Sequence, residues 1–231
     1  MTPLAALAAT VLVGACSAGT RPPGPAPLAP RTLSVAPDTR HLTPDTALAT
    51  LWRLGQPFAQ FRTLITHRTE LWSRNVDIAA VPDALVTRAR RVGNLKLLVT
   101  ADDDCSDSAN VLPYIAKLAE LAPNLELRVV HDSVGYALKA GHRTPDGRTA
   151  TPTLVVLDGD FNDRGCWVER PAQLQYWYIT RGHDVDNDTY RREKLGFYDF
   201  DHGTTTLEEV VGVLEAAAAG TPRCGIAPRA W

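Results

Sequence analysis

The chain has 231 residues, of which 45% are hydrophobic and 22% are charged, so it can bury a sizeable core. This ordinary globular composition excludes wholesale disorder and fibrous architectures. The formal net charge of -2 leaves no broad basic surface, and no nucleic-acid partner is therefore expected.

The N-terminus has the pattern of an export signal. Residues 4–15 are apolar but too few to span a bilayer, and a Val-Gly-Ala-Cys run ends at Cys16. This run resembles the bacterial lipobox, which implies lipidation of Cys16 and a membrane anchor in the cell envelope. Ser17 stands where Asp often retains lipoproteins at the inner membrane, which favours the outer membrane. Because no Lys or Arg precedes the apolar stretch, an apolar leader with an incidental cysteine remains the alternative.

Hydrophobic periodicity predicts helices first and then an α/β pattern. Thr43 and Pro44 can begin a helix, helical spacing continues to Trp72, and Pro82 can open another helix. The apolar runs 95–100 and 125–130 are predicted strands. The helical pattern between them makes a parallel right-handed βαβ unit.

The second half of the chain predicts a hairpin and a last helix. After a helical patch around residues 134–140, the segments 153–157 and 166–168 flank a polar turn, which predicts two antiparallel strands. The pattern Thr206-Leu207-Glu208-Glu209 predicts a capping box that begins a helix at about residue 206.

Several residues in this order resemble the thioredoxin fold. Cys105 follows the first strand and opens a helix, where thioredoxins carry Cys-x-x-Cys, and Pro113 matches the proline that kinks that helix. Thr151 and Pro152 precede the third strand and match the cis-proline loop. The resemblance is closest to bacterial thioredoxin-like proteins with a helical extension and a Trp-x-x-Arg-Pro segment, here residues 167–171. It implies an α/β thioredoxin-like fold, with a central mixed sheet flanked by helices, rather than another α/β sandwich.

The predicted organisation has five parts. They are a signal peptide (1–15), a lipid anchor with a proline-rich linker (16–42), a helical extension (43–92), a thioredoxin-like domain (93–220) and a C-terminal tail (221–231). The linker is crowded with proline and poor in large apolar residues, so it is expected to be an extended tether.

The resemblance implies thiol–disulfide chemistry at Cys105 as the catalytic residue. A helix N-terminus stabilises a thiolate, but a dithiol cycle needs a second cysteine three residues on, and Ser108 stands there. Ser108 could donate a hydrogen bond to the thiolate, or it could be only a helix-start residue. Monothiol exchange or isomerisation is therefore expected, unless Cys166 or Cys224 acts as the resolving thiol.

Two further features bear on reactivity and on client binding. Asp102, Asp103, Asp104 and Asp107 are expected to crowd the thiol and disfavour its anion, which would make it a sluggish nucleophile. By the resemblance, the segment 151–152 would bind an extended client peptide through its backbone.

Cys166 and Cys224 form a possible structural disulfide. Export places them where disulfides persist, and a bond between them would tie the tail to the sheet. Separate free thiols, or pairing of either cysteine with Cys105, are the alternatives.

No metal site and no cofactor are expected. The acidic segment 184–188 resembles a calcium loop, but Thr189 replaces the required turn glycine, so a solvated acidic turn is preferred. His183 and His202 flank this segment without metal-ligand spacing.

The sequence thus predicts an envelope-anchored thioredoxin-like protein that exchanges disulfides with protein clients or a redox partner through Cys105. The alternative is a non-catalytic peptide-binding module that kept the fold after losing the second cysteine. A copper-handling role would need a cysteine pair, which argues against it.

Overall fold

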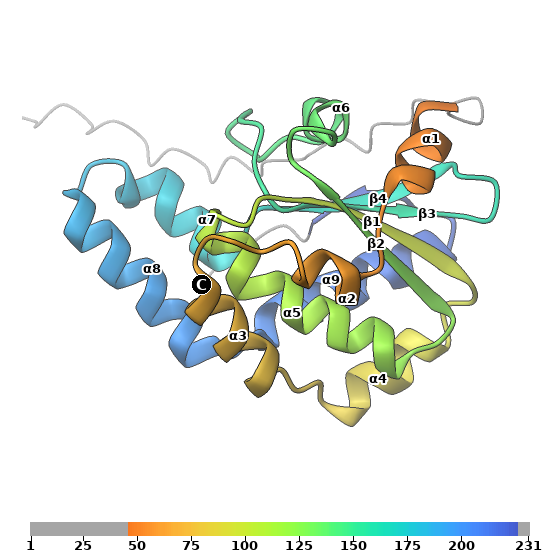
Figure 1. Cartoon of the computed structure of the whole chain (residues 1–231), viewed down its shortest axis with the longest axis horizontal. Coiled ribbons are helices and arrows are strands. Elements are labelled where there is room, and N and C mark those ends of the chain that lie inside the picture. The colour runs from red at the N-terminus through yellow and green to blue at the C-terminus, as the bar shows by residue number, and fades with distance from the viewer. Residues whose placement is uncertain (1–45, 226–231) are drawn as a thin grey trace, which may run out of the picture. The chain divides into compact units, whose positions relative to one another are not determined.

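The computed structural model describes residues 46–225 of the chain (Figure 1). The predicted signal peptide, the predicted lipidation site Cys16 and the proline-rich linker lie outside the described residues. Within residues 46–225, none of the helices has the length and apolar character needed to span a bilayer.

A five-stranded mixed sheet forms the centre of the described part. Its spatial order is β2 (Leu125–His131), β1 (Leu95–Ala101), β3 (Thr153–Leu157), β4 (Asp163–Val168) and β5 (Arg223–Cys224). β1 pairs with β2 in parallel and with β3 antiparallel, β3 and β4 are antiparallel, and β5 runs parallel to β4. The predicted βαβ unit and the predicted hairpin are both confirmed.

Helices surround this sheet. In chain order they are α1 (Thr46–Leu54), α2 (Phe58–Arg62), α3 (Thr69–Ile78), α4 (Asp83–Arg90), α5 (Ser106–Leu121), α6 (Tyr136–Gly141), α7 (Ala172–Trp177), the π-helical turn η1 (Tyr178–Gly182), α8 (Asn187–Asp201) and α9 (Thr204–Ala218). The helical patches predicted after residue 82 and around residues 134–140 correspond to α4 and α6. Neither α7 nor α8 was predicted from the sequence.

The sheet separates two hydrophobic cores because successive side chains of a strand point to opposite faces. In β1, Leu97 and Val99 lie in the larger core, which α3, α4, α5 and α9 cover. Leu98 lies in the smaller core with Leu48 of α1 and Leu138 of α6. Figure 1 shows α1 and α6 on the opposite side of the sheet from α4, α5 and α9.

The start of α9 differs from its prediction. The helix begins at Thr204, after Gly203 in a left-handed conformation, so Thr206 lies inside the first turn and cannot be the N-cap. Glu209 therefore does not close a capping box: its carboxylate accepts hydrogen bonds from the Trp167 indole and the Ala172 amide instead. The predicted capping box is wrong because the helix begins before Thr206 and because the Glu209 carboxylate binds Trp167 and Ala172.

The acidic segment before α8 also has a local role. The Asp186 side chain accepts a hydrogen bond from the Thr189 amide, 2.8 Å away, and so caps the N-terminus of α8. The segment expected as a solvated acidic turn is thus a helix start.

Gly203 allows a test of packing at the start of α9. A Cβ at this position would lie 2.3 Å from the Tyr114 ring, whereas one at Gly220, which also has a positive φ, would meet nothing within 4 Å. We expect Gly203→Ala to lower the free energy of unfolding by about 3 kcal/mol, from the left-handed backbone and the clash together.

The matched control is Gly220→Ala, which keeps only the backbone cost of about 1 kcal/mol. Urea denaturation of both variants measures the difference. Equal losses would show that Tyr114 does not confine this turn.

Candidate functional site

The loop between β1 and α5 places Cys105 at the N-cap of α5. The Cys105 carbonyl accepts the first backbone hydrogen bond of the helix, from Ala109 at 3.1 Å. Its half-buried sulfur donates to the Thr151 carbonyl oxygen at 3.2 Å. The peptide bond between Thr151 and Pro152 is cis. The structure thus brings together two sequence-predicted segments that lie 46 residues apart.

Ser108 follows on the same helix, one turn from the thiol. Residues three apart on a helix are neighbours on its surface. The serine is fully buried, and within the described residues its Oγ has no hydrogen-bond partner. Its hydroxyl therefore keeps an unused capacity to donate a hydrogen bond beside the helix start.

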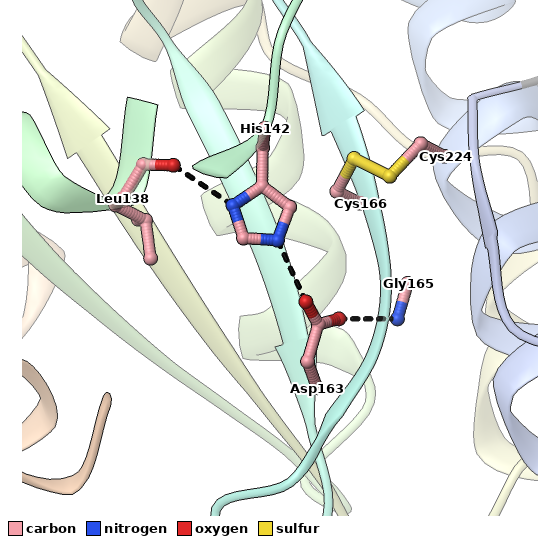
Figure 2. Close-up of a disulfide and its surroundings, with 6 residues drawn as sticks. All are labelled: Leu138, His142, Asp163, Gly165, Cys166 and Cys224. Carbon is pink, nitrogen blue, oxygen red and sulfur yellow. Dashed lines mark hydrogen bonds and ion pairs between the residues drawn. A yellow bond between two sulfur atoms is a disulfide. The ribbon is translucent and has the colours of Figure 1, made fainter. Parts of the chain in front are cut away.

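Cys166 of β4 and Cys224 of β5 form a disulfide, which Figure 2 shows between the two strands. Cys166 pairs across the sheet with Val155, four residues beyond Thr151 along the β3 segment. At about 3.3 Å per residue, Val155 is about 13 Å along the chain from Thr151, whose carbonyl contacts the Cys105 sulfur. Cys105 is the free cysteine of the described residues, and the other two cannot serve as its resolving thiol while they are bonded.

His142 lies beside this disulfide and links α6 to β4 (Figure 2). Its Nδ1 lies 2.8 Å from the Leu138 carbonyl oxygen, and its Nε2 lies 2.7 Å from Asp163 Oδ2. Both oxygens are acceptors, so a ring nitrogen that carries a hydrogen can donate to the oxygen beside it. This pairing holds α6 against β4, the strand that carries Cys166 of the disulfide.

Three of the four carboxylates expected to crowd Cys105 have hydrogen-bond or ionic partners, namely Asp103, Asp104 and Asp107. Asp103 Oδ2 accepts hydrogen bonds from the Thr66 and His67 amides. Burial raises the pKa of Asp103, but these hydrogen bonds outweigh it and hold the pKa well below its ordinary value. Asp104 pairs with Arg68, whose Nε lies 3.2 Å from Asp104 Oδ1.

Asp107, another carboxylate of this group, is the centre of a buried charge network. Its Oδ2 lies 3.1 Å from Lys194 Nζ and 3.2 Å from Arg170 Nη2. Its Oδ1 accepts a hydrogen bond of 2.6 Å from the Tyr198 hydroxyl. Burial, followed by the charge of Asp107, raises the pKa of Tyr198 well above its ordinary value, so this hydroxyl stays a donor.

The network continues from Arg170 to the loop that contacts the thiol. Arg170 also pairs with Glu169, and the Glu169 amide donates to the Pro152 carbonyl oxygen at 2.7 Å. On the other side, Lys194 Nζ donates to Ser106 Oγ at 2.8 Å, directly after Cys105. The same group of charges therefore holds both halves of the site.

Trp167 and Glu209 join β4 to α9 in the larger core. Trp167 Nε1 donates to Glu209 Oε2 at 2.8 Å. Burial raises the pKa of Glu209 to about 7, although the hydrogen bonds from Trp167 and Ala172 act in the opposite direction. Together with the Arg170 network, this contact explains the Trp-x-x-Arg-Pro segment: its tryptophan anchors the last helix and its arginine anchors the start of α5.

The geometry of the site and the comparisons with known proteins place the chain in one family. A mixed sheet with a cysteine at a helix start, in contact with a cis-proline loop, defines a thioredoxin-like protein. A family model described as "Thioredoxin" matches residues 55–187, which is more than half of the chain. The chain belongs to this thioredoxin family. No curated protein matches it.

Two solved structures share the fold. One is an HIV epitope scaffold, 24% identical, with a TM-score of 0.55; the match covers 73% of this chain and 97% of that one. The other is a protein of unknown function from Pseudomonas aeruginosa, 25% identical, with a TM-score of 0.53; the match covers 74% of this chain and 96% of that one.

Sequence reasoning missed Lys194 and Tyr198 and did not assign a partner to Arg170. Lys194 and Tyr198 lie four residues apart on α8, so they share one helix face. That spacing was the feature of the sequence that could have indicated a shared face of α8. Nothing in the chain, however, indicated that this face meets residue 107.

Loss of Arg170 should destabilise the fold strongly. Arg170→Met keeps the apolar stem but leaves Asp107 and Glu169 with one cation fewer in a buried place. We expect the free energy of unfolding to fall by about 3–5 kcal/mol, measured by chemical denaturation.

The control is Arg74→Met, which removes the exposed ion pair with Asp199 and should cost less than about 1 kcal/mol. A loss at Arg170 no larger than that of the control would contradict a structural role for the network.

The pKa of Glu209 predicts a pH dependence of stability. Its folded value of about 7 exceeds the ordinary 4.5, so the folded state binds the proton more tightly. The stability that protonated Glu209 contributes to the folded state is fully present below pH 4.5. It is lost as the pH rises to about 7, which lowers the free energy of unfolding by about 3 kcal/mol.

Glu209→Gln cannot titrate, and we expect its stability to decline less than that of the wild type between these pH values. Denaturant titrations at several pH values measure the two slopes. Parallel slopes would show that Glu209 has an ordinary pKa in the folded chain.

Proposed function

We propose that the chain is an envelope-anchored protein that performs monothiol disulfide exchange or isomerisation on protein clients through Cys105. The observation that carries this proposal is the contact between the Cys105 sulfur and the Thr151 carbonyl at a helix start. The thiol is half-buried rather than sealed in the core, so a client sulfur can approach it.

The helix start supports a thiolate at this position. The first amides of α5 have no partner within the helix, and together with the helix dipole they favour an anion at the N-cap. The buried Ser108 hydroxyl can donate to the same sulfur. Because the neighbouring carboxylates are engaged by Thr66, His67, Arg68 and the Arg170 network, they oppose the anion less than their number suggests.

The exchange step balances without a second cysteine in the chain. The Cys105 thiolate attacks one sulfur of a client disulfide, the client S–S bond breaks, and the other client sulfur leaves as a thiolate that takes up a proton. An external thiol, from a small molecule or a partner protein, then attacks the mixed disulfide and releases Cys105. In isomerisation the released client thiolate itself attacks the adduct, with no net oxidation or reduction.

The client would lie along the Thr151–Pro152 segment. The Thr151 carbonyl that now accepts from the thiol faces the sulfur that would form the adduct, so a client strand bonded to this segment would bring its own sulfur there. We assign client binding to Thr151 and Pro152 on this basis.

Envelope anchoring is the second part of the proposal. It is supported by the apolar leader, the lipobox-like run ending at Cys16 and the proline-rich linker. The disulfide between Cys166 and Cys224 fits an oxidising compartment.

The second candidate function is a peptide-binding module without redox activity. It is favoured by one observation: among the described residues, Cys105 has no second free cysteine to resolve an adduct. Both candidates use the same Thr151–Pro152 segment, so only the chemistry of the Cys105 sulfur separates them.

The test follows adduct formation between the full chain and a disulfide-bonded model peptide. We expect a 1:1 mixed disulfide, detected by mass spectrometry, that forms faster than with free cysteine at the same pH and is released by an added thiol. Cys105→Ser should form none. Ser108→Ala should slow adduct formation, whereas Ser73→Ala on the exposed face of α3 should not.

The two candidates give different outcomes. Adduct formation no faster than with free cysteine, together with peptide binding that survives in Cys105→Ser, would overturn the exchange activity and leave the binding module.

A further inference from the structure

A second group of polar side chains gathers beside the thiol loop, at the carboxyl ends of β1 and β2. Asp102, Asp103 and His131 each place one ligand atom within 4.8 Å of the others. Ala101 and His131 are partners in the parallel register, so the chain after β1 emerges beside the end of β2. Crevices at the carboxyl ends of strands are where α/β proteins commonly bind ligands.

Contacts outside the group hold each of the three side chains in place. Asp103 Oδ2 accepts from the Thr66 amide at 2.8 Å, and Asp102 Oδ1 accepts from the Asp104 amide at 2.9 Å. His131 Nδ1 accepts a hydrogen bond from the Ser133 amide at 3.2 Å and lies 2.9 Å from Ser133 Oγ. When Nε2 binds a metal ion, Nδ1 carries the proton instead and donates to Ser133 Oγ.

These bonds leave the second oxygen of each carboxylate, and Nε2 of the imidazole, without a hydrogen bond from the described residues. A metal ligand characteristically has one atom fixed by an outer partner and the other directed at the metal. Each of the three side chains, including the exposed His131, therefore keeps one ligand atom available for a metal ion.

A cavity adjoins two of the three side chains, Asp103 and His131. It has a volume of about 420 Å³, and Asp103, His131, His67 and Gln56 line it together with apolar side chains. Gln56 Oε1 is shielded from solvent and accepts no hydrogen bond from any described residue. A shielded oxygen of this kind is unfavourable unless a donor or a cation satisfies it.

We propose that Asp102, Asp103 and His131 bind a divalent transition-metal ion, with Zn²⁺ as the ion that fits best. Two carboxylate oxygens and one imidazole nitrogen are ordinary zinc ligands, and three protein ligands leave a position open toward the cavity. The imidazole disfavours Mg²⁺ and Ca²⁺, and the absence of sulfur from the set disfavours Cu⁺. The two carboxylates supply the negative charge that a divalent cation needs. The site is independent of exchange at Cys105.

This site was not predicted from the sequence because α5 separates the aspartates from the histidine. Metal motifs are recognised from short spacings, and here the parallel pairing of β1 and β2 supplies the proximity instead. The histidines singled out from the sequence, His183 and His202, are not part of it.

The test is calorimetric titration of Zn²⁺ into the full chain, free of tags and treated with a chelator. We expect one ion per chain. Asp102→Asn and His131→Ala should each weaken binding by at least about tenfold, and His67→Ala, which removes a hydrogen bond to Asp103, should weaken it by about tenfold. His183→Ala is the matched control, because His183 also pairs with an aspartate, Asp184, but at an exposed site; it should bind as the wild type does.

Cobalt absorption identifies the ligands without relying on the stability of any variant. Co²⁺ in the wild-type chain should show a d–d spectrum without a sulfur-to-cobalt charge-transfer band, and Cys105→Ser should leave the spectrum unchanged. The proposal is overturned by no binding at millimolar Zn²⁺, by undiminished affinity in His131→Ala, or by loss of binding in Cys105→Ser. The last result would place the metal on the thiolate. Neither the zinc titration nor the cobalt spectrum measures disulfide exchange. Failure of the metal proposal can therefore be distinguished from failure of the proposed function.

Discussion

The ionic contact between Asp107 and Arg170 is the constraint on which the site depends. It joins the first turn of α5 to the segment after β4, and Lys194 of α8 completes the charge balance. Taking a carboxylate out of water is unfavourable unless cations and hydrogen bonds replace the water. Here two cations and the Tyr198 hydroxyl do so. Because Asp107 is two residues from Cys105 and Glu169 bonds Pro152, this contact fixes the thiol opposite the Thr151 carbonyl.

Much of the fold followed from local patterns in the sequence. The apolar runs of β1, β2 and β3 were visible because buried strands are short and continuous, and the order of Cys105, Pro113 and Pro152 indicated the family. The helix α8 was missed because its residues are mostly polar, so no apolar stripe marked it. Its two inward residues act through charge and hydroxyl groups, at separations of 87 and 91 residues from Asp107. Contacts of that range belong to the folded topology and not to any window of sequence.

The charges of the thiol loop also could not be interpreted from the sequence alone. Counting Asp102, Asp103 and Asp104 along the chain suggested mutual repulsion around the sulfur, because a sequence shows charges without their partners. The fold brings Arg68 and the amides of Thr66 and His67 to two of these carboxylates. A hydrogen-bonded or paired carboxylate repels a neighbouring anion less than a free one does. The capping box failed for a related reason, since the Trp167 indole competes successfully for Glu209.

The helices before β1 are part of the site because they shape the thiol loop. Trp72 Nε1 donates to the Asp103 carbonyl at 2.9 Å, and Asn75 Nδ2 donates to the Ala109 carbonyl at 2.8 Å. These bonds hold the loop and the first turn of α5 in addition to the contacts made by Arg170. The family match begins at residue 55, so it includes α2, α3 and α4. A loop held by both sets of contacts keeps the Cys105 sulfur and the Asp103 carboxylate in fixed positions. The two proposed chemistries, exchange at the thiol and binding of a cation, could therefore share the four residues 102–105 without requiring the loop to move.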